Sequence, residues 1–73
     1  MTSKEVLNDF ENLGYLISIK NEGFLELTKN NTFIDIDFSV KEYWKENSYW
    51  NSLRFTMQEH KLLTELFKIW RWL

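Results

Sequence analysis

Residues 55–73 read FTMQEHKLLTELFKIWRWL, and this stretch decides the fold. At about 100° per residue, its large apolar side chains fall in one arc and most of its charged side chains fill the opposite face. The apolar arc contains Leu62, Leu63, Leu66, Phe67, Ile69, Trp70 and Leu73. Thr56 and Glu59 have the spacing of a capping box, which marks the start of a helix. The pattern therefore predicts an amphipathic surface helix over 57–71 with one buried side.

The N-terminal stretch repeats this start signal, because Thr2 and Glu5 also have capping-box spacing. Gly14 is placed to end the helix in the left-handed conformation. The apolar residues between these signals share one helical face: Val6, Leu7, Phe10 and Leu13. We therefore expect a first helix over 3–13.

Three alternating stretches follow, at 15–20, 24–29 and 33–38, and each predicts a half-buried strand. A loop at residues 21–23 would give Gly23 a positive φ, and Asn30 with Asn31 can form a type I′ turn. These turns fix the register, because a slip of one residue would reverse the faces. Two rows of side chains then face the helices: Ile17, Leu27 and Ile34 in one row, and Ile19, Leu25 and Ile36 in the other.

The segment 39–55 has the weakest pattern. Tyr43 and Trp44 favour a fourth strand, while the capping-box spacing of Ser39 and Glu42 leaves a short helix as the alternative. Residues 46–52 read as a loop. The expected architecture is a single α+β domain over 1–73, with two layers. An N-terminal helix, a three- to four-stranded antiparallel meander and a C-terminal helix on the same sheet face make up this fold.

Composition excludes several classes of protein. The 73 residues carry a net charge of −2 with both signs interspersed, which argues against a polybasic nucleic-acid binder. There is no cysteine for a disulfide or thiolate metal site, and no apolar run of membrane-spanning length. The first ten residues lack the apolar centre of a signal peptide. We therefore expect a cytoplasmic protein.

The outer sheet face is the first candidate site, because the register places Glu26 opposite Asp35, with Asp37 two residues further on. Like charges in that position cost stability. A basic partner or a cation would explain why they are tolerated. The alternative is an ordinary solvated face on which Lys20 compensates the carboxylates.

Exposed aromatic residues are the second candidate. Trp44, Tyr49 and Trp50 lie in or beside the weakly patterned segment, and Phe24 and Phe33 fall on the outer face by parity. Aromatic groups beside acids are typical of a protein-recognition patch. The alternative is that Trp44 and Trp50 fold over one end of the core.

Catalytic and metal chemistry have little support in the sequence. His60 is the one histidine, on the polar helix face, and it has no second ligand at helical spacing. The two glycines are assigned to turns, and there is no nucleophile motif or phosphate-binding loop. We therefore expect no enzyme, no cofactor and no metal.

Two further interpretations concern partners. Trp70 and Trp72 at the C-terminus either close the core or form a homodimer contact, since an exposed terminal Trp is costly to leave in water. A single-stranded nucleic acid could instead contact three cations and two aromatic residues, namely Lys41, Lys45, Arg54, Tyr43 and Trp44. Net charge makes this second interpretation the weaker one.

The C-terminal stretch TMQEHKLLTELFKIWRWL (56–73) and the N-terminal stretch EVLNDFENLGY (5–15) resemble short uncharacterised proteins encoded by phages and prophages of low-GC Gram-positive bacteria. These stretches cover under half of the chain and consist of helix caps and core positions. The resemblance implies a helix–sheet–helix fold and an accessory gene acting in a bacterial host. Such genes often encode inhibitors of host defence, including anti-CRISPR proteins, or modulators of replication. The resemblance assigns no functional role to any residue of this chain.

Overall fold

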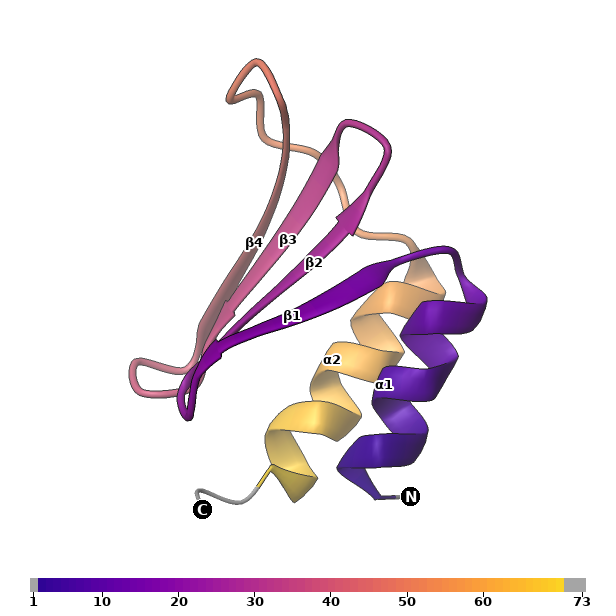
Figure 1. The fold of residues 1–73 in the computed structure, drawn as a ribbon, viewed down its shortest axis with the longest axis vertical. Coiled ribbons are helices and arrows are strands. Elements are labelled where there is room, and N and C mark those ends of the chain that lie inside the picture. Colours follow the sequence, from indigo (N-terminus) through magenta and orange to yellow (C-terminus); the bar gives the residue numbers. More distant parts are fainter. Residues whose placement is uncertain (1, 71–73) are drawn as a thin grey trace.

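The computed structural model describes residues 2–70 and confirms the α+β fold (Figure 1). Its elements are α1 (Ser3–Asn12), β1 (Leu16–Asn21), β2 (Phe24–Lys29), β3 (Thr32–Asp37), β4 (Glu42–Asn47) and α2 (Met57–Ile69). The strands form one antiparallel sheet in the order β1-β2-β3-β4, so the fourth strand is confirmed. Both helices lie side by side on one sheet face, and the other face carries no helix.

Both helices begin where the capping boxes predict. Thr2 Oγ1 accepts from the Glu5 amide at 3.2 Å, and Glu5 Oε1 accepts from the Thr2 amide at 2.9 Å. Thr56 and Glu59 make the same reciprocal pair at 3.1 and 3.0 Å. These bonds satisfy amides that a helix start otherwise leaves without partners.

The helix ends differ from one another. Gly14 follows α1 with φ +100°, as predicted for a left-handed stop. The second helix is shorter than the predicted 57–71, because Trp70 already has an extended backbone with φ −64° and ψ 130°. In that conformation the Trp70 indole stacks on Phe38 at 4.4 Å between ring centroids. The predicted last helical residue, Arg71, lies outside the described residues.

The strand register is the predicted one. Leu27 pairs with Ile17 and Ile34, and Leu25 pairs with Ile19 and Ile36. The two turns differ in detail from the prediction. Asn30 has φ 54° while Asn31 has no positive φ, which excludes the predicted type I′ turn. Gly23 does not need a positive φ, because the Asn21 side chain accepts from its amide and closes the turn.

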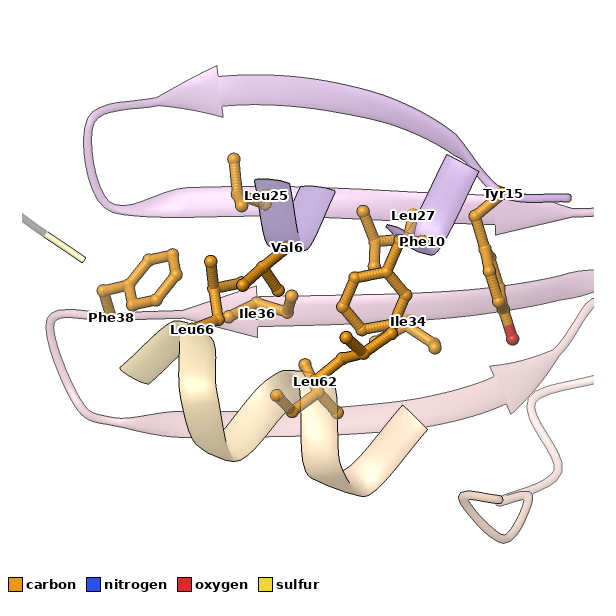
Figure 2. Packing of buried hydrophobic residues seen from close by; sticks show 11 residues of the cluster. Val6, Phe10, Tyr15, Leu25, Leu27, Ile34, Ile36, Phe38, Leu62 and Leu66 are labelled. Carbon is orange, nitrogen blue, oxygen red and sulfur yellow. The ribbon is translucent and has the colours of Figure 1, made fainter. Parts of the chain in front are cut away.

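The core lies between the sheet and the two helices (Figure 2). Its buried apolar residues are Val6, Phe10, Tyr15, Leu25, Leu27, Ile34, Ile36, Phe38, Leu62, Leu63 and Leu66. Ile17 is half-buried, and Ile19 is 63% exposed, so the prediction that Ile19 is buried was wrong. The reason is that β1 is an edge strand, and an open groove lined by Leu7, Ile17, Ile19 and Trp70, among others, lies between it and α1.

A polar network crosses the inner layer beside this core. Glu59 accepts hydrogen bonds from Tyr15 Oη and from Lys45 Nζ, the latter at 2.8 Å. Lys45 also donates to the Arg54 carbonyl oxygen at 3.1 Å. Burial raises the pKa of the Glu59 carboxyl, but the hydrogen bonds from Lys45, Tyr15 and the Thr56 amide outweigh burial, so its pKa lies below the ordinary value of 4.5.

This network corrects two residues of the nucleic-acid interpretation. Lys45 faces the inner layer opposite Ile34, and its side chain is only 11% exposed. Tyr43 also faces inward, where it packs against Phe55 and Phe67. Neither residue is therefore presented to a nucleic acid, because β4 turns alternate side chains to opposite faces and these two occupy the inner one.

Candidate protein-binding site on the outer sheet face

The outer sheet face is strongly acidic. The strand pairing places on it five carboxylates from three strands: Glu26, Asp35, Asp37, Glu42 and Glu46. Among the ion pairs of residues 2–70, the one on this face joins Lys20 Nζ to Glu26 at 3.7 Å. That pair is partly exposed, so it offsets little of the negative charge. The face therefore carries a local negative field despite the mild net charge of the chain.

Asp35 occupies the centre of this face and is only 8% exposed. It lies directly between Glu26 on β2 and Trp44 on β4. The prediction that its side chain points freely into solvent was wrong, although its strand parity was right. Neighbouring side chains cover the carboxyl, because Trp44 and Glu26 flank it across the strands and a loop lies beside it.

The environment of Asp35 disfavours its charge. Its pKa is raised from 3.8 to about 6, first by burial and then by a hydrogen bond with Glu26 and the charges of Glu26 and Glu46. A hydrogen bond from the Trp44 indole lowers it only in part. No ion pair in the described part of the chain involves Asp35.

A cavity of about 240 Å³ opens beside this carboxyl. Its lining combines carboxylates with aromatic and polar side chains, namely Glu26, Phe33, Asp35, Glu46, Asn47, Ser48 and Trp50. Glu46 was missed by sequence reasoning. It shares a strand face with Trp44, and that parity becomes a usable signal once β4 is established as a strand. The site has three carboxylates and two aromatic side chains in one hollow.

The loop at 47–51 supplies the outer wall of this cavity. The Asn47 side chain accepts from the amides of Tyr49 and Asn51, and the Asn47 carbonyl accepts from the Trp50 amide. This folding holds Trp50 at φ 65°, a conformation that costs a bulky residue about 1–3 kcal/mol. Trp50 is nevertheless 81% exposed. The loop thus presents a large indole to solvent from a defined backbone.

The other predicted residues are distributed around the cavity and do not line it. Asp37 Oδ1 accepts from the amide and hydroxyl of Ser39, so this carboxylate closes the turn after β3. Trp44 packs edge-on against Phe24, with 6.2 Å between ring centroids, and stays partly exposed. Tyr49 is 78% exposed beside Trp50. Trp44 and Trp50 belong to the outer face and do not cover an end of the core.

The remaining candidates gain no support from their surroundings. His60 is exposed on α2, and within residues 2–70 no three side chains of His, Cys, Asp or Glu are placed so that they could hold a metal ion together. Trp70 is half-buried on Phe38, so its indole closes the core, and Trp72 lies outside the described residues. Within residues 2–70, neither helix has the length and apolar character needed to cross a membrane.

Comparisons with protein-family models, with curated proteins and with solved structures found no match to this chain. Carboxylates in a hollow with aromatic walls can hold a positively charged group by ion pairing and by cation–π attraction.

Proposed function

We propose that this chain is a non-enzymatic protein-binding module that engages a basic surface of a partner through its outer sheet face. The observation that carries the proposal is the cavity in which Glu26, Asp35 and Glu46 meet Phe33 and Trp50. Exposed tryptophans serve as anchors at protein interfaces, where burial in the complex contributes much of the affinity. A negative field accelerates association with a positive partner and specifies its orientation.

The finer proposal is that the partner is a host protein with a basic cleft, such as a defence nuclease or a replication factor. Its support is the resemblance to short phage and prophage proteins, together with the charge of the outer face. Nucleic-acid-binding clefts are positively charged, and a small acidic module can occupy them in place of the nucleic acid. The expected location is the cytoplasm of the bacterial host.

The test begins with affinity capture from a bacterial lysate, followed by calorimetry on the purified partner. Trp50→Asn is the central variant, because asparagine tolerates the positive φ at this position while the indole is removed. We expect it to weaken binding at least tenfold. Met57→Ala is the matched control, since Met57 is equally exposed but lies at the start of α2. Equal affinities for Trp50→Asn and the unmodified chain would refute the proposal.

Titration with single-stranded DNA tests the alternative function, which is the binding of single-stranded nucleic acid. Lys45 and Tyr43 lie in the inner layer. Of the three cations named for nucleic-acid binding, Lys41 and Arg54 are exposed. We expect weak binding that shows little change between low and moderate salt. Tight binding with a steep salt dependence would favour the nucleic-acid interpretation.

A further inference from the structure

The outer cavity contains a buried carboxyl without a cationic partner. Asp35 lines the hollow and is 92% covered, yet no described lysine, arginine or histidine pairs with it. Glu46 also lines the cavity without an ion pair in residues 2–70. Lys20 on β1 pairs with Glu26 at 3.7 Å and with no other carboxylate of residues 2–70. A buried charge is normally paired, and none of the cations within residues 2–70 supplies that pairing at this position.

The walls of the cavity restrict the chemistry of that group. Phe33 and Trp50 contribute aromatic surface, and Asn47 and Ser48 contribute polar side chains at the rim. A guanidinium group is planar, stacks on aromatic rings and donates several hydrogen bonds to carboxylates at once. An ammonium group is a more strongly hydrated point charge that cannot bond two carboxylates in the same planar way.

We propose that this cavity receives one arginine side chain from the partner protein. The inference rests on the proposed function and adds to it the residue type that the partner inserts. The guanidinium lies between the carboxylates of Asp35 and Glu46 and packs against the aromatic wall formed by Phe33 and Trp50. It thereby supplies the charge that the sheet leaves uncompensated.

Arginine binding is then coupled to the release of a proton. The charged groups that face Asp35 are Glu26 from β2 and Glu46 from β4, with Lys20 from β1 beyond Glu26. Because these surroundings raise the pKa of Asp35 to about 6, its carboxyl is largely protonated at pH 5 and charged at pH 7. The guanidinium prefers the charged form, so its affinity rises with pH across this interval.

The probe for this site is the tripeptide Gly-Arg-Gly, titrated into the isotope-labelled chain and followed by NMR. Gly-citrulline-Gly has nearly the same shape without the charge, and Gly-Lys-Gly has the charge without the planar group. We expect saturable shifts at the amides of Asp35 and Glu46 and at the Trp50 indole with the arginine peptide. We expect at least fivefold weaker binding of the lysine peptide and no saturation with citrulline.

Two variants test the residues directly. Asp35→Asn and Glu46→Gln preserve shape, and each should weaken binding of the arginine peptide at least fivefold. Glu42→Gln lies on the same face outside the cavity lining and is the matched control. Affinity for the unmodified chain should rise severalfold from pH 5 to pH 7, and Asp35→Asn should abolish that rise.

The outcomes distinguish this inference from the proposed function. Equal binding of the arginine and citrulline peptides, or of the arginine and lysine peptides, would overturn it. Unchanged affinity in both Asp35→Asn and Glu46→Gln would also overturn it. If the arginine peptide fails while a captured partner still depends on Trp50, only the arginine inference is wrong. If the arginine peptide binds but a captured partner has the same affinity for Trp50→Asn as for the unmodified chain, the cavity inference stands and the proposed function fails.

Discussion

Asp35 and Glu59 are both buried carboxylates, but they lie on opposite faces of the same sheet and have opposite surroundings. Glu59 receives Lys45, Tyr15 and the Thr56 amide, and its pKa lies below the ordinary value. Asp35 meets other carboxylates, and its pKa lies above the ordinary value. The difference separates a carboxylate that is paired within the fold from one that has no cationic partner among residues 2–70.

The largest expected effect comes from breaking the inner pair. Lys45→Met leaves the Glu59 carboxylate buried without its cation, which should cost about 3–5 kcal/mol of unfolding free energy. Urea denaturation measures this loss, and Lys61→Met, an exposed change on α2, is the control. The double variant Lys45→Met with Glu59→Gln should lose less than the sum of the single changes. If Lys45→Met lowers the unfolding free energy by less than about 1 kcal/mol, the Lys45–Glu59 pair contributes no more than an ordinary surface ion pair.

The next effect separates the two carboxylates by the sign of their pH dependence. A raised folded-state pKa means that Asp35 stabilises the fold below its unfolded value of 3.8, and that this stability is lost as pH rises through about 6. Glu59 has a lowered pKa, so its contribution is present above 4.5 and is lost on acidification. As pH rises from 4 to 7, the unfolding free energy of Asp35→Asn should therefore increase by about 1–3 kcal/mol relative to that of the unmodified chain.

Urea denaturation at a series of pH values measures this difference. Glu59→Gln, measured in parallel, should have a lower unfolding free energy than the unmodified chain above pH 4.5. The two values should converge only at lower pH. The same slope in both variants would contradict the contrast between the two sites.

A smaller effect concerns the pKa of Asp35 itself. Glu26→Gln removes a neighbouring charge, so the pKa of Asp35 should fall toward 3.8 without reaching it, because burial is the largest cause of the rise. Carboxyl NMR titration measures the value directly. Glu42→Gln is the matched control, since Glu42 pairs with Asp37 and does not perturb Asp35. An unchanged Asp35 pKa in Glu26→Gln would show that Glu26 does not contribute to the raised value.

The smallest effect is expected at Lys20. This side chain is half exposed and lies 3.7 Å from Glu26, so Lys20→Gln should change the unfolding free energy by about 0–1 kcal/mol. Thermal unfolding at low and high salt provides the measurement. A larger loss at low salt would mean that Lys20 compensates the outer carboxylates, which was the solvated-face alternative.

Much of the fold follows from local patterns in the sequence. Two capping boxes fix the helix starts, and short turns with period-two alternation fix the register of the first three strands. The fourth strand, EYWKEN, has aromatic and charged residues on both faces, so its parity was not readable. Only the paired sheet shows that Tyr43 and Lys45 face inward while Trp44 and Glu46 face outward.

The candidate site could be predicted only in part for the same reason. Glu26 opposite Asp35 followed from the register, and Trp50 in a loop followed from the break in alternation. The burial of Asp35 did not, because it depends on a loop twelve or more residues further along the chain that forms a wall of the cavity. Interactions between distant segments of this kind leave no periodic signal in the sequence.

The capping carboxylate of α2 has a consequence for how the molecule opens. Glu59 Oε1 accepts from the Thr56 amide at 3.0 Å and from Lys45 Nζ at 2.8 Å, so the helix start and the edge strand share one atom. Fraying that displaces Glu59 from that first turn therefore also breaks its ion pair with Lys45 on β4. We expect the Thr56 amide to exchange with solvent as slowly as the central strands, whereas the Thr2 amide, held by an exposed cap, exchanges rapidly.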